Sequence, residues 1–283
     1  MKILRAVELG MCFGVRDAIT LAQRHAAVGP ITILGELVHN ETVLADLRRR
    51  GVLIRHDPAD APTRQVMITA HGASDQRLNE IRALGLQVIE ATCPLVHRAH
   101  QALAGLVSEG FHPVVIGQRG HVEVRGLTED YPGCDVILSE TELEAVRVRP
   151  RFGVVSQTTQ PVARVRELVG ALRTRFPASE VRWIDTVCRP TKDRQAAAED
   201  LALKCDVVVV IGGAQSNNTR ELTTTCRRYC PRVHQVQSAA ELRSDWFQVE
   251  DTVGLTAGTS TPDELIESIH TTLARLQPKE VFA

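Results

Sequence analysis

Three of the seven cysteines lie in a sequence context that could support metal chemistry. Cys12, Cys93 and Cys188 each stand at, or just before, a stretch whose apolar residues recur with a helical period. A helix N-terminus favours a negatively charged thiolate, because the helix dipole and the free N–H groups carry partial positive charge there. Three thiolates are soft ligands that suit zinc or an iron–sulfur cluster.

The spacing of these cysteines narrows the choice of metal centre. They lie far apart in the sequence and no Cys-x-x-Cys pair occurs, so the local ligand pairs of a zinc finger are missing. A cube-shaped four-iron cluster ordinarily takes four cysteine ligands, and three would leave one iron able to bind a substrate as a Lewis acid. A hydrolase that holds a single zinc ion with the same three thiols is an alternative.

The other four cysteines have simpler interpretations. Cys134 and Cys205 precede strand-like runs and are predicted to be core thiols. Cys226 and Cys230 have the spacing of one helix face, so a second metal site there is a less favoured alternative to two packing residues. A disulfide framework is not expected, because the number of cysteines is odd and the N-terminus shows no secretion signal.

Polar segments recur in step with the three cysteines. His39, His121 and Ser216 each follow one of the cysteines by 27 or 28 positions, after a short apolar run. A second apolar run in each repeat also ends in small polar residues, which predicts three copies of one α/β unit. Because ligands collect at the carboxyl ends of parallel strands, we expect the thiolates and the polar segments to converge on one cavity. The three predicted repeats are residues 1–93, 94–187 and 188–283.

The polar residues of these segments form a candidate anion pocket. Histidines, amides, hydroxyls and loop N–H groups at strand and helix ends are typical ligands of phosphate groups. Neither a Walker-type lysine loop nor a Gly-x-Gly-x-x-Gly turn occurs, so neither a nucleoside triphosphate nor a dinucleotide cofactor is indicated. Glu123 is the one acidic residue of the set next to a histidine and is the natural proton donor. The set comprises His39, His71, His121, Glu123, Thr158, Ser216, Asn217, Asn218 and Ser260.

Short strands that alternate with amphipathic helices must position these residues. Ala-, Leu- and Arg-rich stretches of helical period lie between many of the apolar runs, which predicts an α/β fold with small, largely parallel sheets. A further strand-like segment stands at the N-terminus. The other predicted strands are Ile31–Leu34, Val66–Thr69, Pro113–Ile116, Gly153–Ser156, Asp206–Ile211 and Val253–Thr256.

The composition argues against two classes of partner. With 33 basic and 34 acidic residues, the chain does not indicate a protein that binds nucleic acid or a membrane surface. Its longest apolar runs are of strand length and far too short to span a bilayer. The N-terminus lacks the apolar core of a signal peptide, which predicts a cytoplasmic protein.

The same segments resemble the 4-hydroxy-3-methylbut-2-enyl diphosphate reductase family, the LytB-type iron–sulfur reductases that end the non-mevalonate isoprenoid route. The likeness runs in order and without large gaps from about residue 1 to 275. The matching segments are Met11–Val15, Val38–Asn40, Thr69–Gly72, Ala91–Val96, Gly120–Val124, Gln157–Thr159, Asp185–Cys188, Ser216–Thr219 and Ala257–Pro262.

The resemblance implies a trefoil of three α/β domains around one [4Fe-4S] cluster per chain, held by Cys12, Cys93 and Cys188. It implies that the apical iron binds the hydroxyl of the allylic diphosphate substrate. Two electrons from a ferredoxin or a flavodoxin would then expel water, and protonation would give isopentenyl and dimethylallyl diphosphate.

The resemblance also implies roles for the polar residues. His121 would lie beside the hydroxyl end of the substrate, and Glu123 would deliver protons through Thr158. The residues that match diphosphate-binding positions are His39, His71, Ser216, Asn218 and Ser260, with Asn217 in the same loop.

Several positions depart from the family pattern, among them the segment Arg125–Leu127, which replaces a typical Glu-Gly-Thr. Asn217 stands where the family usually has a serine, and Val122 replaces a usual proline. Arg125 introduces a positive charge that would lower the pKa of Glu123 if the two came close. These departures leave open a divergent paralogue that reduces another allylic or related diphosphate. A non-catalytic redox sensor that uses the cluster as a switch is a separate alternative.

Overall fold

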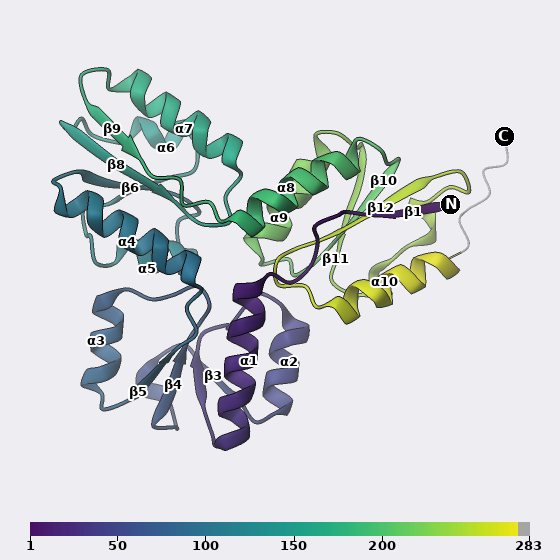
Figure 1. The fold of residues 1–283 in the computed structure, drawn as a ribbon, viewed down its shortest axis with the longest axis horizontal. Coiled ribbons are helices and arrows are strands. Elements are labelled where there is room, and N and C mark those ends of the chain that lie inside the picture. Colours follow the sequence, from purple (N-terminus) through teal and green to yellow (C-terminus); the bar gives the residue numbers. More distant parts are fainter. Residues whose placement is uncertain (277–283) are drawn as a thin grey trace. The chain divides into compact units, whose positions relative to one another are not determined.

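The computed structural model describes residues 1–276, and in this range the chain forms ten α-helices and twelve strands (Figure 1). The strands make three four-stranded parallel sheets. The predicted α/β fold is therefore confirmed, and each strand expected from an apolar run lies within two residues of its expected bounds. None of the helices in this range is both long and apolar enough to cross a membrane.

The first sheet has the strand order β3-β2-β4-β5, which is the second, first, third and fourth strand in chain order. Helices make the crossovers that parallel neighbours require. The elements are α1 (Phe13–Val28), β2 (Thr32–Leu34), α2 (Glu41–Arg49), β3 (Leu53–Arg55), the 3₁₀-helix η1 (Pro58–Asp60), β4 (Gln65–Ile68), α3 (Asp75–Ala83) and β5 (Gln87–Glu90).

The second sheet repeats this order as β7-β6-β8-β9. Alternate residues of its central strands pack into two cores on opposite faces, with Val114 and Ile116 in one and Val115 in the other. The elements are α4 (Pro94–Ser108), β6 (His112–Ile116), α5 (Val122–Thr128), β7 (Asp135–Ile137), α6 (Glu140–Glu144), β8 (Arg151–Ser156), α7 (Val162–Arg175) and β9 (Glu180–Trp183).

The third sheet has the order β11-β10-β12-β1, so that the N-terminal strand takes the fourth place. Its central strand β10 is buried along its whole length, as expected for a parallel strand covered on both faces. The elements are α8 (Arg189–Ala202), β10 (Val207–Ile211), α9 (Asn217–Arg227), β11 (Arg232–Val236), the 3₁₀-helices η2 (Ala239–Glu241) and η3 (Ser244–Trp246), β12 (Thr252–Ala257), α10 (Asp263–Arg275) and β1 (Lys2–Arg5).

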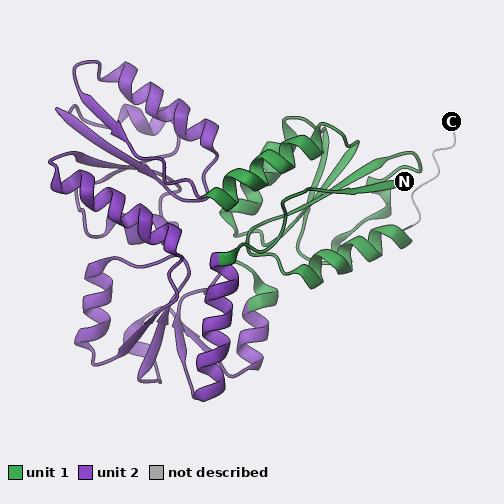
Figure 2. Cartoon of the chain, in the orientation of Figure 1, with its two compact units in different colours: residues 1–13, 39–43, 189–283 green, residues 14–38, 44–188 purple. Residues whose placement is uncertain are grey.

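The position of β1 departs from the predicted repeat boundaries. The prediction assigned residues 1–93 to one repeat, whereas β1 pairs in parallel with β12 of the last repeat, from Lys2 opposite Thr252 to Arg5 opposite Leu255. This pairing supplies the edge strand that the last repeat lacks in its own sequence. The chain divides into two compact units, unit 1 and unit 2 (Figure 2). Unit 1 comprises Met1–Phe13, His39–Val43 and Arg189–Ala283, and unit 2 comprises Gly14–Val38 and Leu44–Cys188.

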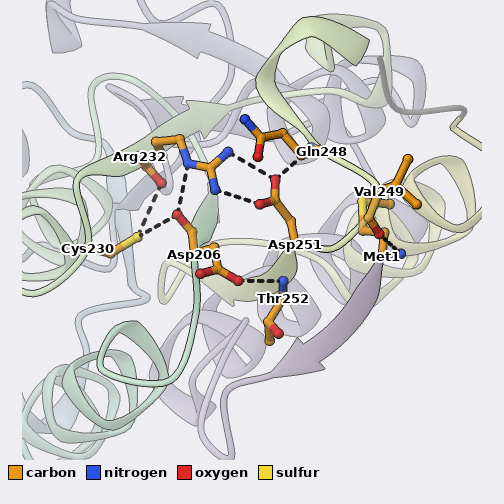
Figure 3. A network of polar contacts seen from close by, with 8 residues as sticks. All are labelled: Met1, Asp206, Cys230, Arg232, Gln248, Val249, Asp251 and Thr252. Atoms are coloured by element: carbon orange, nitrogen blue, oxygen red, sulfur yellow. Dashed lines mark hydrogen bonds and ion pairs between the residues drawn. The ribbon is translucent and has the colours of Figure 1, made fainter. Parts of the chain in front are cut away.

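A polar network fixes the amino ends of the strands in the third sheet (Figure 3). The Arg232 guanidinium donates to both oxygens of the buried Asp251 carboxylate, at 3.0 and 2.6 Å, and to the carbonyl of Asp206 at 3.2 Å. The carboxylate of Asp206 in turn accepts the N–H of Thr252 at 2.8 Å. These bonds satisfy the buried Asp251 carboxylate at the end of the sheet opposite to the polar segments, so the network has a structural role.

Candidate active site

The same backbone hydrogen bond fixes each of the three candidate cysteines. In every case the cysteine N–H donates to a carbonyl oxygen in the segment that follows the third strand of a sheet. The pairs are Cys12 with Thr259 at 3.0 Å, Cys93 with Ala70 at 3.0 Å, and Cys188 with Thr158 at 2.9 Å. The repeated bond gives the three cysteines equivalent places in their repeats, in agreement with the sequence spacing.

Each cysteine also stands at a helix N-terminus, as predicted. Cys12 directly precedes α1, Cys93 is the N-cap of α4, and Cys188 directly precedes α8. The Cys93 side chain makes no cap hydrogen bond to its own helix. All three thiols are half-buried. A thiol that is partly accessible next to the positive end of a helix is suited to bind a metal as thiolate.

Gly14 in the first turn of α1 leaves room for the Cys93 thiol. A Cβ added at Gly14 would lie 2.5 Å from Cys93 Sγ and 3.3 Å from Cys93 Cβ. The first of these distances is too short for any real side chain, so a larger residue would displace the thiol. From the sequence alone, Gly14 has no predicted role. The available signal was a glycine inside a helix, where it costs stability relative to alanine.

Glu123 in unit 2 is a buried carboxyl group, with 2% of its surface exposed. Its Oε1 accepts the N–H of Thr158 at 2.6 Å, and the Thr158 hydroxyl also donates to the carboxylate. Burial raises the pKa of Glu123 to about 7, although both hydrogen bonds act to lower it. A carboxyl group with such a pKa can hold and release a proton near neutral pH.

Helix α5 positions Glu123, which the sequence analysis had placed in a polar loop. His121 is the N-cap of this helix, and its Nδ1 accepts the N–H of Glu123 at 3.2 Å. Arg125 is exposed, and the groups that set the pKa of Glu123 do not include it. The lowered pKa that Arg125 would cause at close range is therefore not found, and burial raises the pKa instead.

Unit 2 brings four of the predicted polar residues together. The His71 and His121 rings meet edge to face, with centroids 5.6 Å apart. Because Nδ1 of His121 accepts a hydrogen bond, the neutral ring carries its hydrogen on Nε2 and can donate it to a ligand. Thr158 joins the proton donor to a candidate metal ligand, since its N–H binds Glu123 and its carbonyl accepts the N–H of Cys188.

Unit 1 brings the asparagines and Ser216 together at the N-terminus of α9. Ser216 is the N-cap, whose Oγ accepts the N–H of Thr219 at 3.3 Å, and the buried Asn217 is the first helical residue. Asn218 Oδ1 accepts the N–H of Thr259 at 2.9 Å. Its buried Nδ2 has no partner within residues 1–276. An unsatisfied buried amide costs free energy, so this group is suited to donate to an anion at the helix N-terminus.

His39 and Ser260 meet in the same unit. Ser260 Oγ donates to the carbonyl oxygen of His39 at 3.3 Å. A Cβ added at Gly213 would lie 2.5 Å from that oxygen, so glycine is needed for the segment His39–Val43 to approach the end of β10. Unit 1 thus holds the predicted residues His39 and Ser260 next to each other.

Gln157 is a buried positioning residue that the sequence analysis missed. Its Oε1 accepts the N–H of Gln118 and the Nε2–H of Gln160, both at 3.0 Å. These bonds tie the segment before His121 to the strand end before Thr158. The only sequence signal was a polar residue directly after a buried strand, inside a segment that matched the family.

The remaining cysteines pack in the cores. Burial raises the pKa of the Cys134 thiol to about 12 and that of Cys205 to about 11. Cys226 and Cys230 are both buried in one hydrophobic cluster, and burial raises the pKa of Cys226 to about 12. Cys230 lies beyond the end of α9, so the expectation of one shared helix face is wrong. Such protonated thiols favour packing over metal binding.

Comparison with known proteins decides the family. A family model described as "LytB protein" matches residues 3–274, nearly the whole chain. The chain belongs to the LytB family. Its relatives include a 4-hydroxy-3-methylbut-2-enyl diphosphate reductase from Anaeromyxobacter sp. (strain Fw109-5), 36% identical over 276 residues that cover 95% of both chains. A reductase of the same name from Campylobacter fetus subsp. fetus (strain 82-40) is 34% identical and covers 99% of this chain and 100% of the relative.

Solved structures of the LytB family share the fold. The E-1-hydroxy-2-methyl-but-2-enyl-4-diphosphate reductase from Plasmodium falciparum matches with a TM-score of 0.90 and 25% identity, over 96% of this chain and 88% of that chain. A second structure, of (E)-4-hydroxy-3-methyl-but-2-enyl diphosphate reductase, matches with a TM-score of 0.67 and 33% identity, over 97% and 99% of the two chains.

Proposed function

We propose that this protein reduces 4-hydroxy-3-methylbut-2-enyl diphosphate to isopentenyl and dimethylallyl diphosphate, the activity for which its LytB relatives are named. The observation that carries the proposal is the buried Glu123, whose pKa is about 7 and whose partner Thr158 also binds the N–H of Cys188. Loss of a hydroxyl as water requires two electrons and two protons, so a proton donor must stand close to a redox centre.

Cys12, Cys93 and Cys188 would hold a [4Fe-4S] cluster, one per chain. The residues fit such a group, because they are three soft ligands with the same backbone bond, each half-buried at a helix N-terminus. When bound, the cluster supplies electrons one at a time and an iron that can act as a Lewis acid toward the substrate hydroxyl.

Gly14→Ala tests the fit of the Cys93 thiol. We expect this change to weaken iron binding by about tenfold to a hundredfold, as for other residues that orient a metal ligand, because the added Cβ displaces Sγ. Iron and acid-labile sulfide per chain after anaerobic purification measure the effect. The matched control is Gly105→Ala in α4, where a Cβ meets no atom within 4 Å and iron content should not change. Equal iron contents in the two variants would contradict the prediction.

The diphosphate would bind at helix and strand ends that present N–H and hydroxyl donors. In unit 1 these are the N-terminus of α9, with its N-cap Ser216 and the unsatisfied amide of Asn218, and the hydroxyl of Ser260. His39 in unit 1 and His71 in unit 2 would supply imidazole donors. Helix N–H groups, hydroxyls and imidazoles can each donate a hydrogen bond to a phosphate oxygen, so the proposed diphosphate site requires no lysine loop.

Glu123 would deliver protons through Thr158. When Glu123 is protonated, its hydroxyl can donate to Thr158 Oγ, which can pass its own proton toward the substrate. His121 would direct its Nε2–H at the substrate oxygen, because its Nδ1 is held by the start of α5. One proton leaves with the hydroxyl as water, and the second forms the new C–H bond of the isoprenyl diphosphate product.

The electrons would come from a ferredoxin or a flavodoxin, and the protein would act in the cytoplasm. Both parts of the proposal rest on the family likeness.

Anaerobic purification followed by metal analysis and a substrate assay tests the proposed function. About four irons and four sulfides per chain are expected, together with conversion of the hydroxylated C5 diphosphate when the enzyme is reduced chemically. A single zinc ion in place of iron would overturn the cluster assignment. An intact cluster that converts no C5 diphosphate would overturn the substrate assignment.

A second candidate, a paralogue that reduces another diphosphate, is favoured by Asn217 alone. This residue is buried at the start of α9, where the family usually has a serine. An amide is larger than a hydroxyl and can shift the bound phosphate. If Asn217→Ser gains turnover of the C5 diphosphate that the unchanged protein lacks, the paralogue assignment is supported.

A further inference from the structure

The N-terminus of α3 is capped by a carboxylate from a distant part of unit 2. Asp130 Oδ2 accepts the N–H of Asp75 at 2.8 Å, and Asp130 Oδ1 accepts the N–H of Gln76 at 2.9 Å. Both donors belong to the first turn of α3, where backbone N–H groups have no partner inside the helix. Asp130 therefore satisfies two of these donors and places a negative charge at the positive end of the helix dipole.

A second pair of contacts joins the same two segments. Ser74, the fully buried N-cap of α3, accepts the N–H of Arg77 at 3.1 Å and donates its hydroxyl proton to Glu129 Oε2 at 2.8 Å. A Cβ added at Gly126 in α5 would lie 3.4 Å from the Cα of Ala73. The helix backbone thus packs directly on the loop before α3, with no side chain between them.

The position of the two negative charges indicates that these contacts stabilise the packing of α3 on α5 and not helix α5 itself. Glu129 and Asp130 follow the C-terminus of α5, where a negative charge is unfavourable for that helix. Their carboxylates instead bind the N-cap and the first turn of α3. We call this set of contacts the acidic clamp, formed by Glu129 and Asp130 with Ser74, Asp75 and Gln76.

The two segments that the clamp joins carry the site residues of unit 2. His71 lies three residues before Ser74, and its ring meets the ring of His121 with centroids 5.6 Å apart. His121 is the N-cap of α5, the helix whose other end leads into the clamp. A shift of α3 against α5 would therefore change the position of His71 relative to His121.

We propose that Glu129 and Asp130 are positioning residues, which clamp the start of α3 to the end of α5 and so hold His71 in place for a diphosphate group. The proposal deepens the proposed function and rests on it for the role of His71. Neither acidic residue contacts the diphosphate. Glu129 and Asp130 must therefore affect the affinity for diphosphate through His71. A general loss of stability would lower the affinity whether or not His71 is present, so the two explanations can be distinguished.

A double-mutant cycle with inorganic diphosphate tests this requirement. Asp130→Asn replaces one accepting oxygen with an NH₂ group that faces a backbone N–H, so the first turn of α3 loses a hydrogen bond. Anaerobic titration calorimetry on the full, cluster-loaded chain compares this variant with wild type, His71→Ala and the double variant. We expect Asp130→Asn to weaken binding about tenfold in the wild-type background and not at all in the His71→Ala background.

Two further variants distinguish the proposed effect on diphosphate binding from an effect of misfolding. Ser74→Ala removes the bond to Glu129 from the other side and should show the same dependence on His71. Glu142→Gln is the matched control, because Glu142 accepts the N–H of Leu138 at 2.6 Å near the start of α6, a helix that packs on α7 and β7. This control should leave diphosphate binding unchanged. Circular dichroism and thermal unfolding establish that each variant is folded.

The possible failures are distinguishable. If Asp130→Asn weakens binding equally with and without the His71 imidazole, or leaves affinity unchanged in the folded protein, the clamp does not act through His71 and the proposal is overturned. If His71→Ala binds inorganic diphosphate as tightly as wild type, the assigned role of His71 is wrong. That result removes the proposed diphosphate site in unit 2, and the clamp proposal with it.

Discussion

Cys93→Ser is expected to remove the cluster and the reductase activity together. A serine hydroxyl is a harder and much less acidic ligand than a thiol, so it does not replace a thiolate on iron. The backbone N–H of residue 93 would still donate to Ala70, and proline would still begin α4. The fold should therefore survive while iron per chain falls from about four to below one, with turnover below detection.

Iron, sulfide and visible absorption after anaerobic purification measure this effect. Cys12→Ser and Cys188→Ser should behave like Cys93→Ser, because all three residues make the same backbone bond. Cys134→Ser is the control, since burial raises the pKa of this thiol to about 12 and it packs in the core of the second sheet. Retention of a full cluster by any of the three variants would exclude that residue as a ligand.

The central strands were predictable from the sequence, whereas most edge strands were not. A central parallel strand is buried on both faces, so β10 reads as an unbroken apolar run from Val207 to Ile211. β5 and β9 are four-residue edge strands with exposed or half-exposed residues, and no periodicity marks them. Their pairing is decided by the neighbouring strand and not by their own composition.

The N-terminal strand shows a second limit. The apolar character of β1 predicted a strand, but nothing local to Lys2–Arg5 indicates that its partner is β12. The topology of the three sheets explains why β1 pairs with β12. The first two sheets contain four strands from one repeat, and the third has only three before α10, so β1 completes it.

The candidate site was predictable where its chemistry repeats. The equal spacing between three cysteines and three polar segments predicted which residues belong to the candidate site. The equivalent N–H bonds of the three cysteines agree with that spacing. The supporting contacts were not predictable, because they depend on distances between segments far apart in the sequence. Gly14 beside Cys93 and Asp130 at the start of α3 are recognisable only when both partners are seen.

The burial of Glu123 also could not be read from the sequence. The sequence predicted Glu123 as a proton donor in a polar segment, with a pKa that Arg125 would lower at close range. The structure makes burial the largest cause of its raised pKa. The free energy of folding thus depends on pH: the stability that protonated Glu123 contributes is present below about 4.5 and is lost as the pH rises through about 7.

Glu123→Gln is expected to lower turnover by about a hundredfold to ten-thousandfold while the cluster remains intact, because an amide cannot donate a proton to the substrate. The unchanged enzyme should lose activity as the pH rises through about 7, since the donor must be protonated. This alkaline decline should be absent from the residual activity of Glu123→Gln. Exposed Glu140 supplies the control, and Glu140→Gln should keep both the rate and the decline.

Thr158→Val separates the proton relay from the cluster. The Thr158 hydroxyl lowers the pKa of Glu123, so its removal should move the alkaline decline to higher pH while turnover falls. The backbone bonds of residue 158 to Glu123 and to Cys188 would remain, so iron content should not change. A rate that is unchanged in Thr158→Val, or a decline near pH 7 that persists in Glu123→Gln, would show that the proton comes from another group.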